Sequence, residues 1–172
     1  REMLLREAKE MVTQYKDVPG VLMFVLGNEN DYGLFWEGAE TANIPEEDRK
    51  STIRAKSLYQ LFDDAVVEMK KIDAGRHPMA ICNGDLLFLN LIAQECKHVD
   101  VLGINSYRGA SFTDLYDRVK KECGKPVMLT EFGCDAFNAA TNSEDQQPQA
   151  DILVSNWKEI YENAAGVGKA GN

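Results

Sequence analysis

The stretch that decides the fold is residues 21–31, VLMFVLGNEND, which begins directly after the helix-breaking pair Pro19-Gly20. Six apolar residues in succession, too short for a helix and bounded by breakers, are typical of a strand buried on both faces of a parallel sheet. The run ends abruptly in polar residues, among them Asn28 and Glu29. We therefore predict a parallel strand over 21–26 with polar side chains at its carboxyl end.

The same alternation of helix and apolar strand extends outward from this stretch. Helical spacing of apolar residues predicts helices over 1–16, 51–72, 86–96, 112–123 and about 145–165. Short apolar runs predict further strands over 78–82, 99–104 and 126–130. Strands and helices in strict alternation predict an α/β fold with a parallel sheet, built either as a (β/α)8 TIM barrel or as a doubly wound open sheet.

Chain length limits how much of a barrel is present. A complete barrel takes about 250 residues, roughly 30 for each strand-helix unit, whereas this chain has 172. We therefore expect residues 1–172 to form one unit of about half a barrel. Position 1 is Arg rather than Met, which indicates a piece of a longer chain. The first strand lacks a following G-x-G-x-x-G turn, which disfavours a dinucleotide-binding sheet.

Composition excludes several classes of partner. The 28 acidic and 19 basic residues give a net charge of −9, which repels polyanions, so nucleic acid is not expected. No run reaches the roughly 18 apolar residues of a membrane span. The N-terminus is amphipathic rather than signal-like, so localisation stays open, a secreted or periplasmic parent included.

Cysteine spacing disfavours a metal site. The four cysteines form no C-x-x-C pair: Cys82, Cys96, Cys123 and Cys134. We therefore expect no zinc and no other metal. Buried free thiols are the expectation, with a disulfide as the alternative in a secreted protein.

Polar residues gather where the predicted strands end, the edge at which parallel α/β folds place their active sites. They are Asn28 and Glu29, then Asn83 and Asp85, then Asn105 and Tyr107, and last Glu131. A carboxylate that abuts a buried strand loses hydration, which is costly unless the site uses it. The alternative is that each glutamate caps a helix or pairs with a lysine in a loop. Two such glutamates favour a functional site.

Three motifs in register resemble clan A retaining glycoside hydrolases. Gly27-Asn28-Glu29 resembles the signature that closes their fourth strand, and 127–133, VMLTEFG, resembles their seventh-strand nucleophile motif. Residues 100–107, DVLGINSY, are similar to their sixth strand, whose tyrosine faces the nucleophile. Within the clan, the sequence is most similar to family 2 β-glycosidases and family 72 β-1,3-glucanosyltransferases, with family 5-like members as an alternative.

This resemblance implies a half-barrel that covers strands 4 to 7 and lacks strands 1–3 and 8. It implies retaining double displacement on a β-linked sugar, without a cofactor. Glu29 would be the acid/base and Glu131 the nucleophile, with Tyr107 donating a hydrogen bond to Glu131. Asn28 would hold the sugar 2-hydroxyl.

Four further side chains have both a functional and a structural interpretation. Trp36 could stack on a sugar or cover a loop. Asn83, Asp85 and Arg108 could reach a substrate hydroxyl, although contacts that stabilise the loops are the alternative. His77 and His98 fall at the amino ends of strands and are expected to be structural.

Trp157 lies at helical spacing with Leu153 and Tyr161, so we expect it in the core rather than at a sugar site.

The resulting hypothesis is a retaining glycosidase or transglycosylase with a carbohydrate substrate. The alternative is a catalytically idle half-barrel that binds carbohydrate or self-associates through its exposed edges. A third hypothesis, an unrelated open-sheet binding domain, predicts that Glu29 and Glu131 lie far apart.

Overall fold

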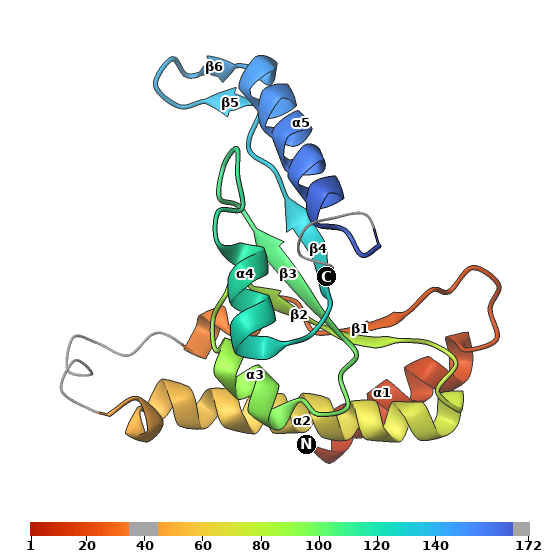
Figure 1. Cartoon of the computed structure of the whole chain (residues 1–172). Coiled ribbons are helices and arrows are strands. Elements are labelled where there is room, and N and C mark those ends of the chain that lie inside the picture. The colour runs from red at the N-terminus through yellow and green to blue at the C-terminus, as the bar shows by residue number, and fades with distance from the viewer. Residues whose placement is uncertain (35–44, 167–172) are drawn as a thin grey trace.

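The computed structural model describes residues 1–34 and 45–166 and, within them, has an α/β fold with a four-stranded parallel sheet (Figure 1). The strands lie in chain order: β1 (Phe24–Leu26), β2 (Met79–Gly84), β3 (Val101–Ser106) and β4 (Val127–Phe132). Because all four run the same way, their carboxyl ends meet at one edge.

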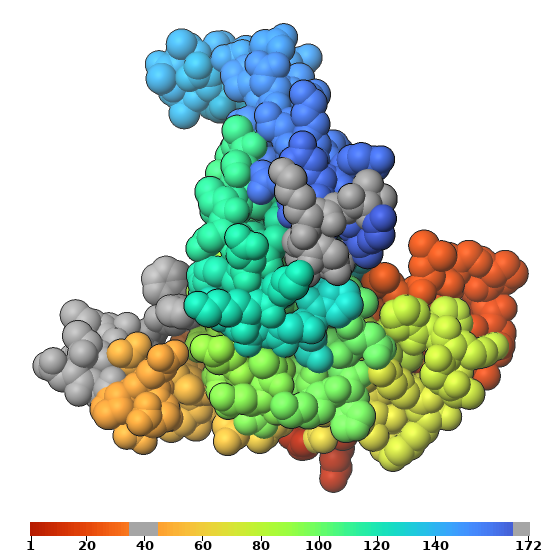
Figure 2. Space-filling model, in the orientation of Figure 1, coloured from red at the N-terminus to blue at the C-terminus, as the bar shows by residue number. Residues whose placement is uncertain are grey.

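Helices precede and follow these strands. They are α1 (Glu2–Tyr15), α2 (Lys50–Asp73), α3 (Leu89–Glu95), α4 (Leu115–Arg118) and α5 (Gln146–Asn163). A π-helical turn, Val119–Cys123, continues α4, and 3-10 turns occupy Tyr32–Leu34 and Glu46–Asp48. A short antiparallel hairpin, β5 (Phe137–Asn138) and β6 (Ser143–Glu144), precedes α5. The hairpin and the first turns of α5 project beyond the rest of the molecule (Figure 2).

Strand order decides between the two architectures that the sequence left open. The order β1-β2-β3-β4 never reverses. Right-handed crossovers in a constant direction place each connecting helix on the same face, whereas a doubly wound sheet reverses its order at a switch point. Accordingly α1 packs on α2, α2 on α3, and α3 on the turn that continues α4. The sheet is therefore a segment of a (β/α)8 barrel.

The helix-facing side of the sheet holds the apolar core. Fully buried side chains from alternate strand positions pack against the helices: Met79, Ile81, Leu102 and Ile104 from the sheet, and Tyr59, Val66, Met69 and Ile92 from α2 and α3. Burying one such side chain contributes about 1.5–3 kcal/mol. This layer fixes the sheet, and the opposite face is left to polar groups.

Two predictions about apolar residues are wrong. The first strand is shorter than predicted and is not buried on both faces, since Leu22 is 79% and Val25 38% exposed. The reason is that β1 is an edge strand of the described sheet.

Trp157, predicted to lie in the core, is 61% exposed. Its ring packs against that of Phe132 in the edge strand β4, with the ring centres 5.5 Å apart.

The four cysteines are free thiols, with Cys82 and Cys96 buried. No helix among the described residues has the length and apolar character needed to span a bilayer.

Candidate active site

Glu29 sits in a tight turn directly after β1. Gly27 has a φ of +74°, and a Cβ there would overlap Asn30 Oδ1 and lie 2.9 Å from Phe62 Cζ, so the position requires glycine. Glu29 itself has a φ of +53°, which is uncommon for a residue with a side chain. Its backbone N–H donates to Cys82 O at 3.2 Å, which fixes the turn on β2.

A β-bulge in β4 sets the direction in which the Glu131 side chain points. Ile104 pairs with Leu129, but the next residue, Asn105, pairs with Glu131, so Thr130 is an extra residue in β4. Regular alternation would point Thr130 and Glu131 to opposite faces. With the bulge, both reach the inner face, because Thr130 contacts Asn105 and Glu131 contacts Tyr107.

Tyr107 holds Glu131. Its hydroxyl donates to Glu131 Oε2 at 2.8 Å, the contact expected from the sequence. This hydrogen bond is the main cause that raises the pKa of Tyr107 above its usual value, followed by burial and by the negative charges of Glu131 and Glu29. The pKa of Tyr107 therefore responds to both carboxylates.

Asn105 connects the two carboxylate-bearing strands. It is 1% exposed, and its Nδ2 donates to Glu29 Oε1 and to Asn28 Oδ1, both at 3.1 Å. Its Oδ1 accepts from Thr130 Oγ1 at 2.6 Å. Asn105 was recognised from the sequence only as a polar residue at a strand end, and Thr130 was missed. Glu29 and Glu131 thus both bind side chains at the end of β3, contrary to the open-sheet hypothesis.

Asn28 lies beside this cluster. Its Oδ1 accepts from Asn105 Nδ2 at 3.1 Å, and the Cys82 sulfur lies 3.4 Å from the same oxygen. Its Nδ2 has no hydrogen-bond partner among the residues that the structure describes. The amide is therefore oriented by the protein and retains a donor for a ligand.

A groove opens beside Tyr107. It has a volume of about 600 Å³ and is lined by Tyr107, Phe132, Gly133, Cys134, Asp135 and Gln149, among others. This lining joins an aromatic ring to amide and carboxylate groups, the combination that suits a sugar. The groove lies between the loop after β3, the segment that follows β4, and α5.

Asn83 is corrected from a substrate contact to a structural residue. It is 2% exposed, and its Oδ1 accepts from Tyr59 Oη at 2.7 Å. Its Nδ2 donates to the carbonyls of Asp85 and Leu87. Asn83 pairs with Ile104 in the sheet, so its side chain faces the helices, and all its polar atoms are used within the fold.

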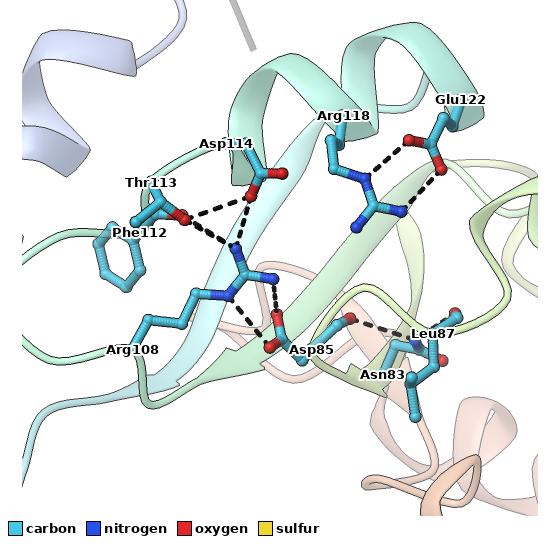
Figure 3. A network of polar contacts seen from close by, with 9 residues as sticks. All are labelled: Asn83, Asp85, Leu87, Arg108, Phe112, Thr113, Asp114, Arg118 and Glu122. Carbon is cyan, nitrogen blue, oxygen red and sulfur yellow. Dashed lines mark hydrogen bonds and ion pairs between the residues drawn. The ribbon is translucent and has the colours of Figure 1, made fainter. Parts of the chain in front are cut away.

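Arg108 is corrected in the same way (Figure 3). Its Nε and Nη2 bind Asp85 at 3.1 and 2.9 Å, and its Nη1 binds Asp114 at 2.9 Å. The same Nη1 also donates to Phe112 O and Thr113 Oγ1. Every nitrogen of the guanidinium is therefore engaged, and Arg108 ties the loop after β3 to the end of β2.

The two histidines have the structural role expected. His77 Nδ1 lies 2.7 Å from Asp73, and His98 Nδ1 lies 2.8 Å from Asp63. Trp36, a candidate sugar platform, lies outside the described residues. Within residues 1–34 and 45–166, no cluster of three His, Cys, Asp or Glu side chains is arranged to hold a metal ion.

Asp31 is a buried carboxyl that the sequence did not single out. It is 1% exposed, and its Oδ1 accepts from the Gly84 N–H at 2.8 Å. Its Oδ2 has no partner among the described residues. Burial, as the largest cause, raises its pKa to about 6, and the nearby charges of Glu29 and Asp85 act in the same direction.

A family model described as the glycosyl hydrolase catalytic core matches residues 41–166, well over half of the chain. The chain belongs to the glycosyl hydrolase catalytic core family. The matched range contains Asn105, Tyr107 and Glu131 and begins after Glu29. No curated protein matches the chain in sequence.

Solved structures confirm the fold of this glycosyl hydrolase core. A GH113 β-1,4-mannanase has a TM-score of 0.60 at 15% identity, with 92% of this chain and 47% of the mannanase covered. A β-glucuronidase from Ruminococcus gnavus has a TM-score of 0.58 at 21% identity, with 91% and 26% covered. A β-glucosidase has a TM-score of 0.61 at 13% identity, with 92% and 53% covered. The chain thus spans about half or less of these structures, as a partial TIM barrel of the glycoside hydrolase clan.

Proposed function

We propose that this chain carries the catalytic carboxylates of a retaining glycosidase or transglycosylase that acts on β-linked sugars. The observation that carries the proposal is the attachment of both glutamates to the end of β3, where Asn105 binds Glu29 and Tyr107 binds Glu131. Asn105 lies in β3 and Tyr107 directly follows its last residue, Ser106, so the two carboxylates are attached to neighbouring positions at this end of the sheet. Retaining glycosidases need two carboxyl groups about 5 Å apart on either side of the scissile bond.

In the proposed mechanism, Glu131 attacks the anomeric carbon and forms a glycosyl-enzyme. Glu29 protonates the leaving oxygen, then takes a proton from water or from an acceptor sugar that displaces Glu131. Tyr107 holds one oxygen of Glu131 and leaves Oε1 for attack. The unused Nδ2 of Asn28 donates to the sugar 2-hydroxyl, a contact that strengthens in the transition state.

The proposal involves a carbohydrate substrate and no cofactor. The structural neighbours are a mannanase, a glucuronidase and a glucosidase, so β-mannosides, β-glucuronides and β-glucosides form the first substrate panel. Within the clan, we favour families 2 and 72 on the Gly27-Asn28-Glu29 and Glu131-Phe132-Gly133-Cys134 sequences. We take residues 1–172 as the part of a catalytic barrel that lacks strands 1–3 and 8, and expect low activity in isolation because subsite walls are missing.

Covalent trapping tests the assignment. A 2,4-dinitrophenyl 2-deoxy-2-fluoroglycoside of each panel sugar is incubated with the longest natural chain that contains these residues, and the labelled peptide is mapped by mass spectrometry. We expect the label on Glu131. A label on another residue, or substrate turnover that survives Glu131→Gln, would contradict the proposal.

A second candidate is an idle half-barrel that binds carbohydrate or associates with another copy. A groove of about 660 Å³ lies between α1, α2 and the β1 edge, and its lining includes Leu4, Met11, Val25 and Leu58 but neither Glu29 nor Glu131. An uncovered strand edge beside apolar side chains favours self-association. A stable dimer by light scattering, with glycan binding and no turnover, would support this candidate.

A further inference from the structure

We infer that Thr130 is a positioning residue that orients the acid/base Glu29 through the amide of Asn105, an inference that rests on the function proposed above. Thr130 and Glu29 share no hydrogen bond among the described contacts, but each binds Asn105, at 2.6 and 3.1 Å. We call Thr130, Asn105 and Glu29 the relay.

The direction of each hydrogen bond in the relay follows from the chemistry of its members. A threonine hydroxyl has a single hydrogen, and its short contact with Asn105 Oδ1 identifies that oxygen as the acceptor. The opposite end of the amide faces two oxygens, Asn28 Oδ1 and Glu29 Oε1. Only an NH2 group can satisfy both. A flipped amide would set three oxygens against one another and leave the Thr130 hydroxyl facing an NH2 donor.

Cys82 reinforces the same orientation. Its buried thiol lies 3.3 Å from Asn105 Oδ1 and 3.3 Å from Thr130 Oγ1. A thiol hydrogen is a weak donor, so the Thr130 hydroxyl is the stronger of the two groups that hold the Asn105 oxygen. The cluster is nearly dry, since Cys82 is 6% and Asn105 1% exposed, and a hydrogen bond in such surroundings is electrostatically stronger than in water.

The relay has a consequence for proton transfer. Asn105 holds Oε1 of Glu29, and Oε2 has no partner among the described residues. That oxygen is therefore the one that faces a leaving group. Without the Thr130 hydroxyl the Asn105 oxygen loses its stronger donor, so the amide is held less firmly and Glu29 is oriented less firmly with it. The carboxyl would leave its productive orientation while Glu131, held by Tyr107, would stay in place.

The test compares Thr130→Val, which keeps the shape and removes the hydroxyl, with Thr130→Ser, which keeps the hydroxyl. Thr113→Val is the matched control, because its hydroxyl belongs to the Arg108 cluster. kcat/KM is measured on phenyl β-glycosides, which need a proton to depart, and on 2,4-dinitrophenyl β-glycosides, which do not. General acid catalysis contributes about 10²–10⁴-fold, and misorientation forfeits part of it.

For Thr130→Val we expect kcat/KM to fall about 10-fold or more on the phenyl substrate and less than about 3-fold on the dinitrophenyl substrate. Thr130→Ser should recover most of the loss, and Thr113→Val should show no difference between substrates. Fluoroglycoside labelling of Glu131 should proceed as in the wild type.

Equal losses on both substrates, no loss, or no recovery in Thr130→Ser would overturn the relay. If Glu131 is labelled normally, such results leave the proposed function standing. If the wild type is not labelled at Glu131, the proposed function and the relay fail together.

Discussion

Two polar clusters lie at the carboxyl ends of the same strands, one around Arg108 and one around Asn105, and they differ in how their hydrogen-bonding groups are used. In the Arg108 cluster every guanidinium nitrogen binds a partner from the protein. In the Asn105 cluster the network ends on two carboxylates, Glu29 and Glu131, each with an oxygen that no described residue binds. We call the first network closed, because its guanidinium nitrogens are all used within the protein, and the second open, because it leaves carboxylate oxygens unused. A closed network stabilises a loop, whereas an open network can act on a ligand.

The largest expected effect comes from the open cluster. Glu131→Gln removes the proposed nucleophile and should lower kcat by on the order of 10⁴-fold or more. The free energy of unfolding should change little, because Glu131 is exposed and the amide oxygen can still accept from Tyr107. Steady-state kinetics and urea unfolding measure the two quantities. Glu122→Gln, in the surface pair with Arg118, is the matched control and should keep full activity.

Arg108→Met should show the opposite pattern in the closed cluster. It removes a charge-assisted, two-pronged contact with Asp85 and the contact with Asp114, and should lower the free energy of unfolding by about 2–3 kcal/mol. kcat/KM at a temperature where the variant is folded should stay within about 3-fold of the wild type, the scale of a small indirect effect. If Arg108→Met instead lost 100-fold in kcat/KM with an unchanged free energy of unfolding, Arg108 would be a substrate-binding residue.

Asp31 provides a pH-dependent test beside the Asn105 cluster. Its pKa of about 6 lies above the ordinary 3.8, so the folded state binds the proton more tightly than the unfolded state. The stabilisation is complete below about pH 4 and is lost as the pH rises through about 6. Asp31→Asn stays neutral and should be more stable than the wild type at pH 7 by about 3 kcal/mol.

Urea unfolding at pH 4 and pH 7 measures this difference between wild type and Asp31→Asn. Agreement of the two proteins at both pH values would show that the Asp31 carboxyl titrates normally.

The smallest expected effect is a change in the titration of Tyr107. Its pKa is raised above 10.0, first by the hydrogen bond to Glu131, so the hydroxyl still donates at pH values where an ordinary tyrosine is ionised. In Glu131→Gln this pKa should fall back toward its ordinary value. Tyrosinate absorbance shows the change, with a Tyr107→Phe partner in each background to subtract the other tyrosines. An unchanged pKa would argue against the contact in solution.

For three of the four strands, the sequence predicted the apolar start to within two residues but stopped short of the polar end. Predicted strands 78–82, 99–104 and 126–130 correspond to Met79–Gly84, Val101–Ser106 and Val127–Phe132. Each observed strand runs further at its carboxyl end, because backbone pairing continues after the apolar run stops. Polar residues that look like loop residues in the sequence are therefore part of the sheet.

Asn83 and Asn105 show why the site was only partly predictable. Both are asparagines near the ends of adjacent strands, yet Asn83 faces Tyr59 in the helical layer and Asn105 faces Glu29. The face on which a strand residue lies depends on register, which a single sequence does not specify. Glu29, Glu131 and Tyr107 could be predicted as site residues because the order of the three family-like motifs carries the register with it, whereas Thr130 stands in the bulge, which has no sequence signature of its own.

The extra residue in β4 gives this segment two conceivable registers. If Thr130 paired with Asn105 and the strand continued without a bulge, Glu131 would pair with Ser106, and strict alternation would turn its carboxylate toward the helices. Phe132 would then leave the helix-facing side, where its ring packs against those of Phe112 and Trp157. The apolar packing of Phe132 is therefore part of what keeps the neighbouring carboxylate on the inner face.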